Sequence, residues 1–223
     1  MTTLSEDGNR RGRAGVAAFD FDGTLVRGDS VHVFLTQLLG PRRLGAALFA
    51  AGPAMGLGYV RGGRDRAKAA LFFRALPGIE AARVDALGRS FGRQLAGRVR
   101  ADLAARLHWH RDRGHRLVLV SASLTNYLEP FAAEVGIDDV IATRLEVGDD
   151  GRLTGRMAGP NVRGQEKATR LRALLGPSPV ELWAYGDSRG DREMLAMADH
   201  PRLVDEQVVP PPDAVAGARP GRW

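Results

Sequence analysis

Short apolar runs of strand length alternate along the chain with longer segments in which Ala, Leu and Arg recur at helical spacing. Continuous apolar runs are typical of parallel strands, because both faces of such a sheet are covered. Helices are expected between the second predicted strand and about residue 135, over 165–175 and over 191–198. Strands alternating with helices predict an α/β fold, a Rossmann-like parallel sheet. The predicted strands are 15–21, 116–120, 139–143 and 181–185, with an edge strand at 202–204.

A long helical block follows the first predicted strand. Residues 30–112 have helical spacing throughout, with Gly-Pro, Gly-Gly and Pro-Gly interruptions at 40–41, 62–63 and 77–78. The block is too long for a crossover between neighbouring strands, so it predicts an inserted α-helical domain. A hairpin is expected over 144–157, around Asp149-Asp150-Gly151. The predicted domains are a core of 15–29 with 113–205, an insert of 30–112, a disordered leader of 1–14 and a disordered tail of 206–223.

The charge balance at first suggests a polyanionic partner. Lys and Arg number 32 against 26 Asp and Glu, a net charge of +6. The basic residues are dispersed and mixed with acids, whereas a nucleic-acid-binding arm would concentrate them. We therefore predict no nucleic-acid partner. The absence of cysteine excludes disulfides, Cys-ligated zinc and iron–sulfur centres.

One uncharged stretch, residues 44–60, is a candidate for spanning or contacting a membrane. It is 17 residues long and contains Pro53 and four glycines, whereas a spanning helix needs about 20 predominantly apolar residues. We interpret it as packed helices of the insert, with contact to an apolar substrate or a membrane surface as the alternative. The first fifteen residues have no apolar signal region, so a cytoplasmic protein is expected.

Polar side chains gather where the predicted strands end. Open α/β sheets bind ligands at the carboxyl ends of their strands, and carboxylates that converge there repel one another unless a cation lies between them. Acids for Mg²⁺, with an ammonium and a hydroxyl for phosphate, indicate phosphoryl transfer. Taken singly, each residue could also be an ordinary turn or helix-cap residue. The set is Asp20, Asp22, Ser121, Lys167, Asp187 and Asp191.

The order and spacing of these residues resemble the haloacid dehalogenase superfamily, and within it subfamily IB, the phosphoserine-phosphatase-like branch. The first motif of that family, DxDGT[LV], is intact at residues 20–25. The second is the apolar strand LVLVSAS with Ser121, and the third is Lys167 in GQEKATRL. The fourth is the acidic GDxxxD of residues 186–191. The resemblance covers about residues 15–205 and implies that the insert is a helical cap.

The resemblance also implies catalytic roles. Asp20 would be the nucleophile that forms an aspartyl-phosphate, and Asp22 the general acid and then the base. Ser121 and the amide of Ala122 would bind phosphate oxygens, and Lys167 would neutralise both Asp20 and the transferring group. The second acid, Asp22, favours a phosphatase over a dehalogenase, because an alkoxide leaving group needs a proton.

A Mg²⁺ cofactor is implied by the same resemblance. Its ligands would be Asp20, Asp187 and the backbone carbonyl of Asp22, with Asp191 holding the metal's waters or orienting its ligands. Asp29 matches a cap-entry acid that contacts a substrate amino group, although it could equally be a helix cap. No residue of the chain matches the cap arginine that grips the substrate carboxylate in that branch, although Arg66, Lys68 and Arg74 lie nearby in sequence. Of these, Lys68 is the candidate substrate contact in the cap.

Two departures from the pattern bear on specificity. Gly190 stands where phosphoserine phosphatases usually have Asn, and the second motif reads Ser-Ala-Ser rather than Ser-Gly-Gly. We therefore predict a Mg²⁺-dependent phosphomonoester hydrolase for a small phosphorylated metabolite: phosphoserine-like, histidinol-phosphate-like or another amino-alcohol phosphate. The alternatives are a lipid-phosphate phosphatase that uses the apolar cap stretch, and a catalytically idle binding module of the same fold. Both a monomer and a homodimer remain open.

Overall fold

The computed structural model describes residues 14–204, with side chains throughout that range except for 53–64. The leader expected over 1–14 and the tail expected over 206–223 lie outside the described residues, apart from Ala14, which begins the first strand. No helix among the described residues is long and apolar enough to cross a membrane.

Five parallel strands form the central sheet, in the order β3-β2-β1-β6-β7. At its centre Phe19 pairs with Leu119 on one side and with Tyr185 on the other. The predicted α/β fold with a parallel sheet is therefore confirmed. The strands are β1 (Ala14–Phe19), β2 (Arg116–Leu124), β3 (Asp139–Thr143), β6 (Val180–Gly186) and β7 (His200–Leu203).

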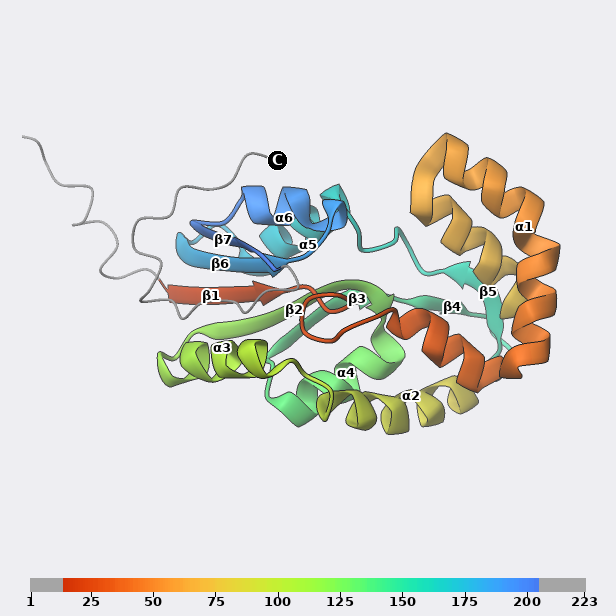
Figure 1. The fold of residues 1–223 in the computed structure, drawn as a ribbon, viewed down its shortest axis with the longest axis horizontal. Coiled ribbons are helices and arrows are strands. Elements are labelled where there is room, and N and C mark those ends of the chain that lie inside the picture. The colour runs from red at the N-terminus through yellow and green to blue at the C-terminus, as the bar shows by residue number, and fades with distance from the viewer. Residues whose placement is uncertain (1–13, 205–223) are drawn as a thin grey trace, which may run out of the picture.

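Alternation along β1 divides the apolar core between the two faces of the sheet. Val16 and Ala18 pack on the face covered by α5 (Gln165–Leu175) and α6 (Arg192–Ala196). Ala17 and Phe19 pack on the opposite face, beneath α3 (Ala101–Asp112) and α4 (Thr125–Val135). Burial on both faces explains the continuous apolar run of β1 (Figure 1).

The 30–112 block forms α1 (Ser30–Ala75), α2 (Ala81–Ala96) and α3. The expected interruptions at 40–41 and 62–63 do not end α1; at Gly40 the backbone adopts φ 75°, which bends the helix. Figure 1 shows α1 folding back on itself beyond the strand arrowheads, while α2 runs along α4. Thus α2 and α3 pack beside core elements. The division of the chain into core and inserted cap stays a prediction.

The structure shifts several predicted boundaries. β1 ends at Phe19 rather than at residue 21, and β2 continues past Ser121 because its pairing with β3 resumes at Leu124 after an irregularity. The helix expected over 191–198 consists of a 3₁₀ turn, Arg189–Asp191, and the shorter α6. The hairpin is present as antiparallel β4 (Leu145–Val147) and β5 (Leu153–Met157).

Candidate active site

A cavity of about 640 Å³ opens at the carboxyl edge of the sheet, between the strand ends and α1. Parallel strands all present their carboxyl ends at one edge, so side chains distant in sequence meet there. The structure brings nine candidate residues of the sequence analysis to the wall of this cavity: Asp20, Asp22, Asp29, Lys68, Ser121, Ala122, Lys167, Asp187 and Asp191. Arg66 and Arg74 are not among its lining residues.

Lys167 is buried between two carboxylates. Its Nζ donates to Asp20 Oδ1 at 2.5 Å and to Asp191 Oδ1 at 2.6 Å. Burial raises the pKa of Asp20 to about 7, against the lowering effect of Lys167, and Asp191 adds to the rise. Burial lowers the pKa of Lys167, but the two carboxylates outweigh it and the net direction is upward. The lysine is therefore held as a cation beside Asp20.

A third carboxylate, Asp187, joins this pair of acids at the rim. Ligand oxygens of Asp20, Asp187 and Asp191 lie within 4.8 Å of one another. Burial, and after it the charge of Asp191, raises the pKa of Asp187. Three carboxylates facing one ammonium leave an excess of negative charge. This all-oxygen donor set therefore fits a hard divalent cation such as Mg²⁺.

The loop after β1 approaches Asp187 closely. A Cβ at residue 23 would lie 2.1 Å from Asp187 Oδ2, and Gly23 has φ 87°. Only glycine satisfies both the space and the left-handed backbone here. The Gly of the first motif therefore lets residues 20–23 lie against the acidic cluster.

The Asp22 carboxylate does not join the acidic cluster. It accepts hydrogen bonds from Ser30 N and Ser30 Oγ, both at 2.9 Å, and from Ser123 Oγ at 2.5 Å. Tyr127 in turn lies 2.8 Å from Ser30 Oγ through its hydroxyl. Burial raises the pKa of Asp22 despite these bonds. The sequence reasoning missed Ser30, Ser123 and Tyr127, although the second serine of Ser-Ala-Ser was the available signal.

The predicted phosphate-binding loop is internally ordered. Ser121 is buried, and its Oγ accepts from the backbone N–H of Ser123 at 3.1 Å. The carbonyl of Ala122 accepts a hydrogen bond from Lys68 Nζ. Asp29 is the N-cap of α1, with Oδ1 accepting from His32 N at 3.0 Å. The cap role that the sequence left open for Asp29 is therefore present, and its substrate role stays a prediction.

Asn161, which no sequence signal singled out, ties α1 to the core. Its Oδ1 accepts from Lys68 Nζ at 3.0 Å and from Thr143 Oγ1 at 2.8 Å. Its Nδ2 donates to Asp65 Oδ1 at 2.7 Å. Asp65 and Lys68 are three residues apart on α1, so both reach the same amide.

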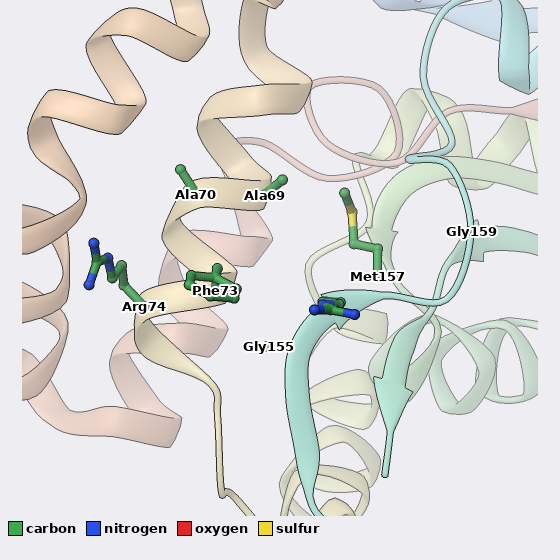
Figure 2. A pocket seen from close by; sticks show the side chains of 8 residues that line it. Ala69, Ala70, Phe73, Arg74, Gly155, Met157 and Gly159 are labelled. Carbon is green, nitrogen blue, oxygen red and sulfur yellow. The ribbon is translucent and has the colours of Figure 1, made fainter.

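A second pocket lies between the last turns of α1 and strand β5 (Figure 2). It is largely apolar, with Phe73 and Met157 in its wall, and its charged lining residues are both arginines, Arg74 and Arg156. Its lining contains no carboxylate, hydroxyl or histidine side chain. The pocket therefore offers neither a nucleophile nor a metal ligand, and the candidate chemistry stays at the sheet edge.

A family model described as haloacid dehalogenase-like hydrolase matches residues 17–196. The chain belongs to that family. Protein CicA of Caulobacter vibrioides is 40% identical over 192 residues, which cover 82% of this chain and 83% of that protein. Phosphoserine phosphatase SerB2 of Mycobacterium tuberculosis is 30% identical over 184 residues, 81% of this chain and 41% of that protein.

Solved structures agree on the fold. A Bordetella pertussis Tohama I protein of unknown function has a TM-score of 0.67 at 25% identity, covering 82% of this chain and 86% of the other. A phosphoserine phosphatase in its apo form has a TM-score of 0.55 at 17% identity, covering 83% and 84%. The prediction of a haloacid dehalogenase-superfamily hydrolase, in the branch with phosphoserine phosphatases, is confirmed.

Proposed function

We propose that this protein is a Mg²⁺-dependent phosphomonoester hydrolase that acts on a small phosphorylated metabolite through an aspartyl-phosphate. The observation that carries the proposal is Lys167, buried between Asp20 and Asp191 with Asp187 beside them. A carboxylate nucleophile attacking a dianionic phosphate must overcome repulsion between like charges. A lysine and a divalent cation at that point supply the compensating charge.

The chemistry divides between the two acids of the first motif. In the first step an oxygen of Asp20 bonds to phosphorus, the bond from phosphorus to the leaving oxygen breaks, and Asp22 gives that oxygen its proton. In the second step Asp22 takes a proton from water, whose oxygen bonds to phosphorus as the bond to Asp20 breaks. Inorganic phosphate leaves, and both acids return to their starting states. The raised pKa of Asp22 supports its role as a proton donor.

Phosphate binding and metal binding fall to neighbouring groups. Ser121, the amide of Ala122 and Lys167 would hold the phosphate oxygens. Asp20, Asp187 and the carbonyl of Asp22 would hold Mg²⁺, with Asp191 orienting its ligands. When bound, the ion would supply positive charge to the phosphoryl oxygens.

The leaving group would lie against the cap side of the cavity, which Asp29 and Lys68 line. The names of two relatives support a small phosphorylated metabolite as substrate. One is the phosphoserine phosphatase given above. The other is a histidinol-phosphatase of Neisseria meningitidis, 33% identical over 111 residues, 47% of each chain.

The test is hydrolysis of p-nitrophenyl phosphate with Mg²⁺. Asp20→Asn should abolish turnover while the circular dichroism spectrum stays unchanged, because the amide is a poor nucleophile of the same shape. Asp149→Asn, in the exposed hairpin turn, is the matched control and should keep full activity. EDTA should remove the activity and Mg²⁺ should restore it. Turnover by Asp20→Asn would overturn the proposal; no turnover of any phosphate ester by the wild type would support an idle binding module.

A lipid phosphate is the second candidate substrate, favoured by one observation. Phe49, within the uncharged stretch 44–60, is 89% exposed on α1. An apolar ring on the outer face of a helix suits contact with a bilayer surface. Hydrolysis of phosphatidic acid in vesicles, faster than that of soluble phosphates and weakened by Phe49→Ser, would favour this candidate. Indifference to vesicles would remove it.

A further inference from the structure

Three Lys and Arg side chains line the cavity, and two of them are already engaged. Lys167 binds Asp20 and Asp191, and Lys68 binds Ala122 and Asn161. The third is Arg163, which is partly buried. Within the described part of the chain no carboxylate pairs with its guanidinium.

The position of Arg163 depends on the glycine of the fourth motif. A Cβ added to Gly190 would lie 3.1 Å from Arg163 Nε and 3.2 Å from its Cγ. The arginine side chain therefore packs directly over Gly190. The two segments are also joined by a backbone hydrogen bond of 2.9 Å, from Gly164 N to Gly190 O. Asparagine at residue 190, the usual residue of the phosphoserine phosphatases that this motif resembles, would compete for the same space.

This placement puts a guanidinium beside the reacting end of the cavity. Gly190 precedes Asp191, whose carboxylate binds Lys167 at 2.6 Å and also accepts from Ser188 N at 3.0 Å and Ser188 Oγ at 2.8 Å. The Asp191 carboxylate therefore already accepts hydrogen bonds from other donors. An arginine that has lost part of its hydration, and has no counter-ion, gains most from an anion that it can bind through two N–H groups.

We propose that Arg163 is a specificity-determining residue that binds a second anionic group of the substrate, a carboxylate or a second phosphate, while Lys167 serves the phosphoryl group that is transferred. The proposal rests on the proposed function for the identity of the site. It adds that the metabolite carries two anionic groups, and that the Gly190–Arg163 pair selects for the second.

A matched substrate pair tests this proposal. 3-Phosphoglycerate and glycerol 3-phosphate differ in having a carboxylate or a hydroxymethyl group, and glycerate 2,3-bisphosphate introduces a second phosphate. We expect the wild type to prefer a doubly anionic ester. Arg163→Gln should lower kcat/KM for that ester by about 10- to 100-fold, the range for a charge-assisted hydrogen bond. It should change kcat/KM for glycerol 3-phosphate and p-nitrophenyl phosphate less than about 3-fold.

Two further variants separate this role from general charge or folding effects. Arg189→Gln removes an exposed arginine from the neighbouring turn. It should leave kcat/KM unchanged for both the doubly anionic ester and glycerol 3-phosphate. In Gly190→Ala the new Cβ would lie 3.1 Å from Arg163 Nε and 3.3 Å from Ser188 Oγ, so both side chains must move by a few tenths of an ångström. The fall in kcat/KM should therefore be larger for the doubly anionic ester than for glycerol 3-phosphate. An equal loss on all esters in Arg163→Gln would place the arginine on the transferred phosphate. That result, or a wild type without preference for a second anion, would overturn the proposal.

Binding keeps this result separate from the proposed function. Calorimetry with Asp20→Asn protein measures the Kd of the same esters without turnover. A wild type that hydrolyses no ester, together with Arg163-dependent binding of the doubly anionic one, would reject the proposed function and retain the anion site. Hydrolysis of p-nitrophenyl phosphate, together with binding of the doubly anionic ester that is insensitive to Arg163→Gln, would retain the proposed function and reject the anion site.

Discussion

The side-chain amide of Asn161 donates a 2.7 Å hydrogen bond to the carboxylate of Asp65, joining the segment before α5 to α1. The two residues are 96 positions apart in sequence. The connections between α1 and the core contain Gly28 and Gly78, both with positive φ and with open space around them. The Asn161–Asp65 contact is therefore one of the contacts that hold α1 over the cavity, together with the buried Phe34 and Phe72 of the same helix.

Breaking this contact should loosen α1. Asp65→Ala should raise KM about 10-fold, because a hydrogen bond to a charged group contributes about 1.5–3 kcal/mol, with a smaller change in kcat. Asn161→Ala should have a larger effect, since it also removes the bonds to Lys68 and Thr143. The double variant should raise KM no more than Asn161→Ala alone does, because both substitutions remove the same hydrogen bond.

A distance measurement checks the same prediction without turnover. The chain has no cysteine, so spin labels can be placed at exposed Ala50→Cys on α1 and Ala133→Cys on α4. Asp65→Ala should add a population with a different label separation. An unchanged distance distribution would show that other contacts hold α1 in place.

Removing the ammonium of Lys167 should affect both turnover and stability. Lys167→Met leaves Asp20 and Asp191 buried and facing each other, and breaking a buried pair costs about 3–5 kcal/mol. We expect loss of turnover and a lower free energy of unfolding in urea without Mg²⁺. Part of the lost stability should return with millimolar Mg²⁺. An equal response of wild type and variant to Mg²⁺ would argue against a cation at this cluster.

The Ser123–Asp22 hydrogen bond makes a prediction about leaving groups. Ser123→Ala removes one of the donors that orient Asp22, so proton transfer from Asp22 to the leaving oxygen should become slower. Turnover of an alkyl phosphate should fall about 10-fold or more, and that of p-nitrophenyl phosphate much less, because nitrophenolate leaves without a proton. Ser90→Ala removes a hydroxyl that donates to the carbonyl of Leu87 on its own helix and serves as the control. Equal losses on both esters would place Ser123 outside the proton-transfer step.

The buried His110 should make a destabilising contribution in mild acid. Burial, followed by His115 and nearby arginines, lowers the pKa of this buried histidine to about 3. Its usual pKa is near 6.5, so below that pH the unfolded chain takes up a proton that the folded protein does not. The His110 contribution to the free energy of unfolding should drop by up to about 1.4 kcal/mol per pH unit between about pH 6.5 and 3. Asp20 acts in the opposite direction, because its pKa of about 7 lets the folded protein take up a proton before the unfolded chain does, so the histidine effect is read as a difference between wild type and variant.

Urea denaturation at several pH values checks this expectation. Relative to wild type, His110→Gln should lose less stability as the pH falls from 6.5 to 5, whereas His108→Gln, exposed on the same helix, should behave as wild type. Part of the histidine-dependent loss should remain in His110→Gln, because burial also lowers the pKa of His115. The same pH dependence in wild type and His110→Gln would contradict the assignment.

The sequence by itself determined the sheet and the place of the chemistry. Apolar runs bounded by polar residues specify buried parallel strands, and such strands necessarily put Asp20, Ser121 and Asp187 at one edge. The hairpin and the helix that carries Lys167 in its first turn followed from equally local signals. These features depend on neighbours in sequence, which a single chain displays directly.

The tertiary structure alone decided which side chains meet across long separations. Ser123 reaches Asp22 over 101 residues, and Asn161 reaches Asp65 over 96. Arg163 lies over Gly190 because two loops pack together. Such contacts depend on side-chain direction and on how α1 bends back over the sheet, and neither is encoded by a local period of hydrophobic residues.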